Sequence, residues 1–237
     1  MILHIPHSST ILPDTFAVAE GVSLQEEFHR MTDWFTDELF DFYDAKKLIF
    51  PWSRLYCDVE RFRDDKDEDM AKKGMGVCYT TSSFGTRLRE VSDEEKEFIK
   101  YIYYDSHHEK FEKLVEEELE ENGQALIVDC HSFSNEVLPH EESHVRPDIC
   151  IGTDSFHTPD VLLEKIRRLF ENAGLKVEVN EPFSGTIVPL KFYANDRRVK
   201  SIMIEVNRKL YLNAQYERSA DFHKIKSLIS KVLKTIY

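Results

Sequence analysis

The stretch Ala125-Leu126-Ile127-Val128-Asp129-Cys130-His131-Ser132 changes abruptly from apolar to polar residues. The same change occurs after three other apolar runs: Ile2–Ile5 before Pro6-His7-Ser8-Ser9, Ile149–Ile151 before Gly152-Thr153-Asp154, and Ser201–Val206 before Asn207-Arg208. Short apolar runs without alternation are typical of strands that are buried on both faces. The sequence therefore predicts a buried sheet whose strands end in polar side chains.

Segments with helical periodicity separate these runs. Apolar residues recur every three or four positions over residues 24–42, 98–119, 161–170 and 219–236. Strands that alternate with helices predict an α/β fold, with a mixed, mostly parallel sheet and helices on both faces. In such sheets ligands bind beyond the carboxyl ends of the strands. The polar residues that follow the apolar runs lie at these ends.

Length and composition favour one globular domain over residues 1–237, because 41% of the residues are apolar and no linker or repeat marks a boundary. The formal net charge of −13 disfavours non-specific nucleic-acid binding. No apolar run approaches the roughly 20 residues of a membrane span, and the N-terminus lacks the pattern of a signal peptide. We therefore expect a cytoplasmic protein without nucleic-acid or membrane partners, in an oligomeric state that the sequence does not indicate.

The four cysteines, Cys57, Cys78, Cys130 and Cys150, form no CxxC pair. This spacing predicts buried thiols instead of disulfides or a cysteine metal site. Nucleophilic catalysis by Cys130 beside His131 is one alternative. Adjacent strand residues point to opposite faces, which argues against such a dyad.

Two histidines follow predicted strands and are candidate metal ligands. His7 follows Ile2–Ile5, and His131 lies two residues after Asp129, on the same side of its strand. Zinc accepts imidazole nitrogen and carboxylate oxygen as ligands, and Asp129 can orient such a ligand. The alternative is that each histidine only hydrogen-bonds nearby backbone.

Glu205 is the one carboxylate within the apolar run Ser201–Val206. Burial in such a strand raises the pKa of a carboxyl group and suits it to general acid–base catalysis. The alternative is an edge strand on which Glu205 faces water.

The segment from Pro51 to Arg89 has weak periodicity and many charges, and we predict an active-site loop with short strands. The residues Asp58-Val59-Glu60-Arg61 would alternate along a strand, with Asp58 and Glu60 on one face. Arg54 and Arg61 can bind a substrate carboxylate, because the guanidinium group matches it in shape and charge. Surface salt bridges are the alternative.

The order of several short segments resembles that of the N-formylglutamate amidohydrolase family over nearly the whole chain. The matching segments are His4-Ile5-Pro6-His7-Ser8-Ser9, Thr32-Asp33, Asp58-Val59-Glu60-Arg61-Phe62, Gly74-Met75-Gly76-Val77, Asp129-Cys130-His131-Ser132, Pro147-Asp148-Ile149, Pro182-Phe183-Ser184-Gly185 and Glu205-Val206-Asn207-Arg208. The family's fold is similar to that of the zinc carboxypeptidases. Its activity is the hydrolysis of N-formyl-L-glutamate to formate and L-glutamate in histidine breakdown.

The resemblance implies roles for individual residues. It implies a metal ion, expected to be zinc, bound by His7, Asp33 and His131, with Glu205 as the catalytic carboxylate. An acidic N-acyl amino acid would be the substrate. Arg61 would bind a carboxylate of this substrate. For a substrate with two carboxylates we expect Arg54 and Arg208 as further binding residues, and Asn207 also as a substrate-binding residue. His108 matches a family histidine, without an assigned role.

The position of Asp33 sets a condition for this ligand set. A continuous helix through residues 24–42 would place Asp33 opposite the apolar stripe, so a ligand role for Asp33 requires a break near Thr32 or a site on the outer face. Two alternative functions are hydrolysis of another acyl-amino-acid or peptide amide, and a binding protein that has kept the fold without catalysis.

Overall fold

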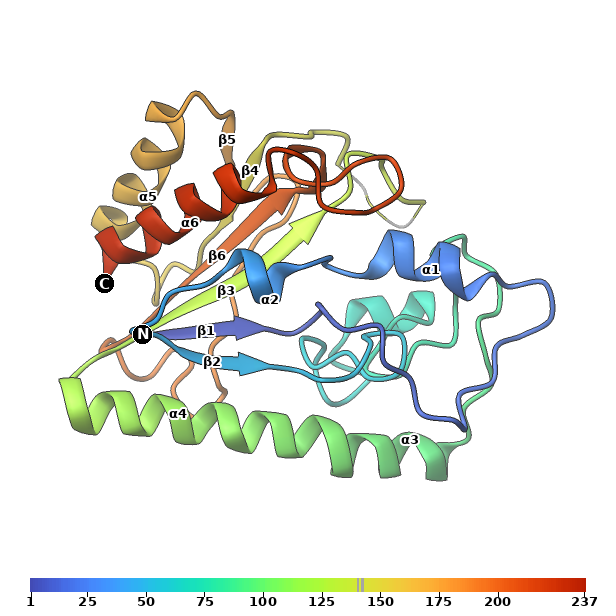
Figure 1. Ribbon diagram of the computed structural model, residues 1–237. Helices are drawn as coiled ribbons and strands as arrows, with labels where there is room; N and C mark the ends of the chain where they lie inside the picture. The colour runs from blue at the N-terminus through green and yellow to red at the C-terminus, as the bar shows by residue number, and fades with distance from the viewer. Residues whose placement is uncertain (140, 142) are drawn as a thin grey trace.

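A six-stranded sheet forms the centre of the protein, in a computed structural model that describes residues 1–139, 141 and 143–237 (Figure 1). The strand order is β2-β1-β3-β6-β4-β5. The strands are β1 (Ile2–Ile5), β2 (Lys46–Ile49), β3 (Ala125–Phe133), β4 (Ile149–Gly152), β5 (Val177–Val179) and β6 (Val199–Asn207). Neighbouring strands are parallel except for β4 and β6, which are antiparallel. The predicted mixed, mostly parallel sheet is confirmed.

Helices cover both faces of this sheet (Figure 1). On one face, α2 (Thr36–Leu39), α5 (Asp160–Asn172) and α6 (Phe222–Ile236) pack on the strands. On the other face lies α4 (Ser106–Asn122), which continues α3 (Asp93–Ile99) through a π-helical segment, Lys100–Asp105. In the described part of the chain, no helix combines the length and the apolar character needed to cross a membrane.

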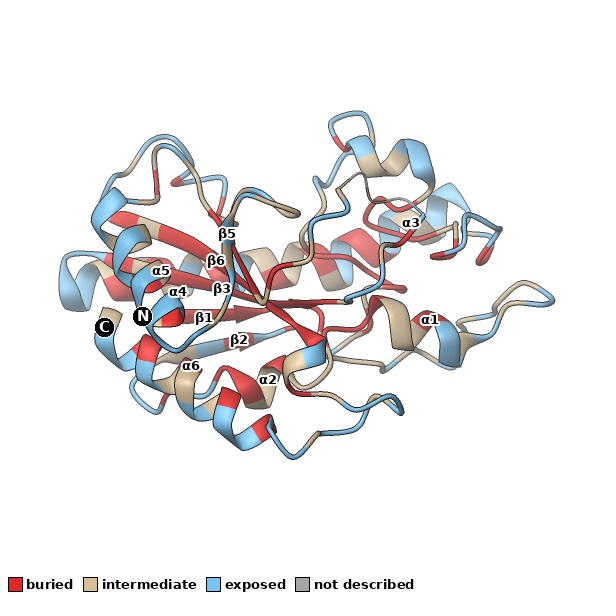
Figure 2. Cartoon of the chain, turned by 90° about the horizontal axis from the view of Figure 1, so that it is seen from above, coloured by how far each residue is buried: buried red, intermediate tan, exposed pale blue. Residues whose placement is uncertain are grey.

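Alternation along the strands divides their side chains between two cores. In β3, Val128 and Cys130 pack with α5 and α6, while Ile127 packs with Phe111 of α4. Both faces of β3 are therefore apolar and buried, and Figure 2 shows the central strands mostly in the colour of buried residues. Burial on both faces explains why the sequence of these strands does not alternate. Cys130 is a buried thiol in the first of these cores, on the face opposite His131.

The predicted periodic segment at residues 24–42 breaks into two helices. Helix α1 (Leu24–Met31) ends where the Thr32 backbone N–H donates to the Phe28 carbonyl, and α2 begins after Phe35, which has a φ of 60°. Thr32 has extended dihedrals (φ −84°, ψ 136°) that interrupt the helix, and the left-handed Phe35 lies directly before α2. The break required near Thr32 is therefore present, with Thr32 at the C-terminal end of α1.

Residues 51–89 form a loop region, as predicted, although Asp58–Arg61 is a turn and not a strand. The Asp58 carboxylate Oδ1 accepts the Glu60 backbone N–H at 3.1 Å, which is the local side-chain bond that favours a turn. Helical structure in this region consists of a short 3-10 helix, Asp69–Lys73. The four-residue strand β2 is not predicted by the sequence pattern, because only Leu48 of its residues is buried.

Candidate active site

A cavity of about 1110 Å³ opens at the carboxyl ends of β1, β3 and β6. The register of the sheet places polar residues of neighbouring strands side by side. His4 of β1 lies beside Asp129 of β3, and His131 of β3 lies beside Glu205 of β6. All four side chains belong to the face of the sheet that α4 covers further back. Neighbouring strands therefore bring together residues that are far apart in the sequence.

His7 is held by a buried carboxylate. Its Nε2–H donates to Asp58 Oδ1 at 2.9 Å, and its Nδ1 is buried without a hydrogen-bond partner. Asp58 is fully buried and accepts from Arg54 Nη2 at 2.8 Å and from the Tyr79 hydroxyl at 2.7 Å. Burial alone would raise the pKa of Asp58, but Arg54, His7 and Arg61 hold it well below its usual range. Because Nε2 carries the proton that is donated to Asp58, Nδ1 of His7 keeps a free lone pair.

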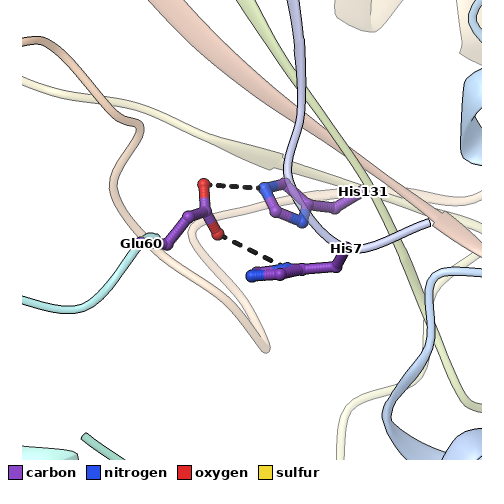
Figure 3. A group of neighbouring side chains, drawn as sticks. All are labelled: His7, Glu60 and His131. Carbon is purple, nitrogen blue, oxygen red and sulfur yellow. Dashed lines mark hydrogen bonds and ion pairs between the residues drawn. The ribbon is translucent and has the colours of Figure 1, made fainter. Parts of the chain in front are cut away.

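Carboxylates surround His131 on both sides of its ring. Its Nδ1 lies 2.9 Å from Asp33 Oδ2, and its Nε2 lies 3.1 Å from Asp129 Oδ1. The same Nε2 lies 3.1 Å from Glu60 Oε1 (Figure 3). Burial alone would lower the pKa of His131, but Glu60, Asp129 and Asp33 raise it well above its usual range. The surroundings of His131 thus stabilise positive charge.

Asp33 reaches this site because the chain turns after α1. The Asp33 backbone N–H donates to the His7 carbonyl at 3.0 Å, and Asp33 Oδ2 lies 3.7 Å from His7 Nδ1. Arg208 Nη2 donates to the other oxygen, Oδ1, at 3.1 Å. Burial opposes ionisation of Asp33, but hydrogen bonds with His131 and His7 hold its pKa well below its usual range. The structure therefore brings together the three predicted metal ligands.

Glu205 faces the same cavity from β6. Its Oε2 is buried without a hydrogen-bond partner, and burial raises its pKa to about 8. A buried carboxyl group with a raised pKa is suited to proton transfer near neutral pH. This placement agrees with the inward-facing alternative for Glu205 and not with the exposed edge-strand alternative.

The four predicted substrate-binding residues lie in different surroundings. Arg54 donates hydrogen bonds to Asp58. Arg61 Nε lies 3.5 Å from Asp58 Oδ2, an ion pair without a hydrogen bond, and Arg61 Nη2 makes a long 3.4 Å contact with the Tyr79 hydroxyl. Arg208 donates to Asp33 and to the backbone carbonyls of Ser132 and Arg30. Asn207 donates to the Pro147 carbonyl and is absent from the described residues that line the cavity. Of the four predicted substrate-binding residues, Arg61 is thus the one with a buried donor, Nε, that has no hydrogen-bond partner.

Comparison with known proteins agrees with this geometry. The family model for N-formylglutamate amidohydrolase matches residues 1–212. This chain belongs to the N-formylglutamate amidohydrolase family. The family resemblance predicted from the order of its short segments is therefore confirmed.

Solved structures show the same fold. The N-formylglutamate amidohydrolase of Ralstonia eutropha JMP134 has a TM-score of 0.85 at 20% identity, over 99% of this chain and 92% of that one. A gene product of Agrobacterium tumefaciens has a TM-score of 0.68 at 20% identity, over 100% of this chain and 90% of that one. No curated protein matches the sequence. At these identities the two structures support the fold, and the family assignment rests on the family model.

Several residues near the site of this family member had no predicted role. His4 is fully buried, with Nδ1 2.9 Å from Asp129 Oδ1 and Nε2 3.0 Å from His107 Nε2. Its one sequence signal is a polar residue inside the apolar strand Ile2–Ile5. His108 lines the cavity, donates from Nε2 to the Val59 carbonyl at 2.9 Å, and has a pKa lowered by burial to about 4. It therefore holds the turn at Asp58–Arg61 as a neutral imidazole.

Proposed function

We propose that this protein hydrolyses the amide bond of an acidic N-acyl amino acid, N-formyl-L-glutamate in the first instance, with a bound divalent ion. The observation that carries the proposal is the meeting of His7, His131 and Glu205 in one cavity, next to Asp33. Family membership supports the reaction class. The products would be formate and L-glutamate.

The residues present fit a metal ion, and zinc is the ion we propose. His7 Nδ1 is a buried atom without a partner, and Asp33 Oδ2 lies 3.7 Å from it and 2.9 Å from His131 Nδ1. Two ligands of a tetrahedral zinc ion are about 3.3 Å apart, given bond lengths near 2.0 Å. The carboxylates around His131 also favour positive charge at this place. Two imidazoles and one carboxylate form a donor set that zinc accepts.

The chemistry that a bound ion supplies at such a site is polarisation of the scissile carbonyl and a lower pKa of water. Glu205 would accept a proton from the attacking water and deliver it to the nitrogen of the breaking C–N bond. Its raised pKa allows both transfers near neutral pH, and positive charge nearby favours its ionised form. Asp58 and Arg54 would keep the His7 ring oriented during the reaction.

Arg61 would bind a carboxylate of the substrate. Its Nε is a buried donor without a hydrogen-bond partner, and its side chain lines the cavity. A carboxylate at this place would accept a charge-assisted hydrogen bond. The donors of Arg208 that bond to Asp33 and to backbone carbonyls support the metal ligand, so Arg208 would act on the substrate only indirectly.

Metal analysis of the purified protein, together with an assay for formate release from N-formyl-L-glutamate, tests this proposal. We expect about one zinc ion per chain. His7→Ala and His131→Ala should each lose both zinc and activity, because removal of one of three protein ligands weakens zinc binding strongly. The exposed His223 provides the control, and His223→Ala should retain both properties. Full zinc occupancy in the two site variants would disprove the ligand assignment. Metal binding without formate release would redirect the search to another acyl-amino-acid or peptide amide.

A further inference from the structure

The arginines that line the cavity differ in their partners. In the described part of the chain there are four of them: Arg30, Arg54, Arg61 and Arg208. Arg54 Nη2 donates to Asp58 Oδ2 at 2.8 Å, and Arg61 Nε forms an ion pair with the same oxygen at 3.5 Å. Arg208 Nη2 donates to Asp33 Oδ1 at 3.1 Å. The charge of each of these three guanidinium groups is thus partly balanced by a carboxylate of the protein.

The Arg30 side chain contacts an aromatic ring instead of a carboxylate. Its Cζ lies 3.8 Å from the centre of the Phe84 ring, so the guanidinium group lies against the face of the ring. Within the described residues, this group makes no hydrogen bond or ion pair. Stacking uses a face of the planar guanidinium group, whereas its N–H donors point outward in the plane. Arg30 therefore holds its donors and its positive charge beside the cavity without a carboxylate partner.

Arg30 lies at the end of α1, close to the proposed metal site. Figure 1 shows α1 beyond the carboxyl end of β1. The Arg30 carbonyl accepts from Arg208 Nη1 at 2.9 Å, and the same guanidinium group of Arg208 donates to Asp33. Phe84, against which the Arg30 side chain lies, is 47% exposed. The backbone of Arg30 is thus tied to the metal site, while its side chain reaches the rim of the cavity.

A substrate with two carboxylates needs more than one cation in this cavity. The cavity is itself lined by carboxylates, among them Asp33, Glu60 and Asp129. Such groups repel an anionic substrate unless cations balance its charge. Arg61 would bind one carboxylate near the ion, because its ion-pair partner Asp58 also accepts the His7 N–H. The other carboxylate requires a second cation.

The two carboxylates of glutamate lie at different distances from the scissile amide. The α-carboxylate is attached to the carbon that bears the amide nitrogen, whereas methylene groups separate the side-chain carboxylate from that carbon. Arg61, beside the ion, suits the first, and Arg30, at the rim, suits the second. We infer that Arg30 binds the side-chain carboxylate of the substrate, with the free edge of its guanidinium group donating paired hydrogen bonds.

This inference rests on the proposed function and deepens it, because it narrows the substrate class to N-acyl amino acids with an acidic side chain. Phe84 acts as a positioning residue, since it covers one face of the guanidinium group and leaves the edge to the substrate. A side-chain amide in place of the carboxylate cannot form charge-assisted hydrogen bonds of the same strength. Arg30 therefore distinguishes derivatives of glutamate from those of glutamine.

Two measurements on the full chain test this inference. The first is KM, from formate release, for N-formyl-L-glutamate and for N-formyl-L-glutamine. The second is the binding of glutarate and of its monoamide, measured by isothermal titration calorimetry, which needs no turnover. Arg30→Gln should raise KM for N-formyl-L-glutamate and weaken glutarate binding, each about tenfold, as expected for a lost charge-assisted hydrogen bond. The values for the glutamine derivative and for the monoamide should change much less.

Matched variants separate a direct contact from overall charge and from folding. Arg87 pairs with Glu90 on the surface and is absent from the described lining of the cavity, so Arg87→Gln removes the same charge and should keep the wild-type values. Arg30→Lys keeps the charge without the planar fork and should recover part of the loss. Phe84→Leu should raise KM for N-formyl-L-glutamate less than Arg30→Gln does. Zinc analysis and circular dichroism verify that each variant keeps its metal and its fold.

The outcomes distinguish this inference from the proposed function. Equal changes for the charged and the uncharged member of each pair would indicate lost packing and would overturn the role of Arg30. The same loss in Arg87→Gln would assign the effect to overall charge and would also overturn it. Formate release from neither substrate by the wild-type protein would refute the proposed function, and glutarate binding would then decide on Arg30 alone. Glutarate binding that is unchanged in Arg30→Gln, or absent in the wild-type protein, would overturn the inference.

Discussion

The paired ends of β3 and β6 and the turn at Asp58–Arg61 deliver side chains to one cavity in different ways. The strand ends carry His131 and Glu205, whose positions follow from strand register. The turn carries Asp58 and Glu60, whose positions follow from side-chain hydrogen bonds. The strand residues are thus placed by backbone pairing between strands, whereas the turn residues are placed by side-chain hydrogen bonds within the turn and to His7.

The carboxylates of these two regions differ most in their partners. Glu205 and Asp58 are both buried, but the pKa of Glu205 is raised to about 8 and that of Asp58 is held well below its usual range. Glu205 Oε2 has no hydrogen-bond partner, whereas Asp58 accepts from Arg54, His7 and Tyr79. Burial alone therefore does not assign a role. The unpartnered carboxylate is suited to proton transfer, and the paired one to orientation.

The largest effect is expected at the strand end. Glu205→Gln should lower kcat by about 10²- to 10⁴-fold and leave the metal content unchanged, because it removes a proton acceptor and not a ligand. Steady-state assays of formate release and metal analysis measure the two properties. Glu178 is an exposed carboxylate on β5, and Glu178→Gln is the control with wild-type turnover. Near-normal kcat in Glu205→Gln would remove Glu205 from the reaction.

A smaller effect on turnover, with a clear effect on metal binding, is expected in the turn. Asp58→Asn weakens the acceptor at His7 Nε2, so the affinity for Zn²⁺ should fall about 10- to 100-fold, as for other groups that orient a metal-bound histidine. Competition titration with a chelator measures this loss. Asp64, an exposed residue of the same loop, provides the control variant Asp64→Asn. Unchanged affinity in Asp58→Asn would mean that Asp58 does not orient a ligand.

The smallest effect is expected for Arg61, at the end of the same turn. Arg61→Ala should raise KM for N-formyl-L-glutamate about tenfold, since a hydrogen bond to a charged group contributes about 1.5–3 kcal/mol. The KM for an analogue with amide-capped carboxylates should change less, because it lacks the charge. Arg63 pairs with Asp105 on the surface, and Arg63→Ala is the control. Equal increases in KM for both substrates would indicate lost packing and would contradict carboxylate binding by Arg61.

The order of strands and helices is largely predictable from sequence because each element has a strong local pattern. Strands β1, β3, β4 and β6 are apolar on both faces and end in polar residues, as predicted. Strand β2 lies at the edge of the sheet and buries one residue, so its sequence has no such pattern. Local patterns therefore reveal central strands better than edge strands.

The sequence by itself determined the α/β class, the family and the positions of His7, His131 and Glu205 at strand ends. These follow from local periodicity and segment order, which need no long-range contacts. Only the tertiary structure decided which nitrogen of His7 faces inward, and how Asp33 and Glu60 approach it. The inward nitrogen depends on Asp58, 51 residues away, and the approach of Asp33 depends on a backbone bond to the His7 carbonyl. Such contacts form between segments brought together by folding, so no local pattern records them.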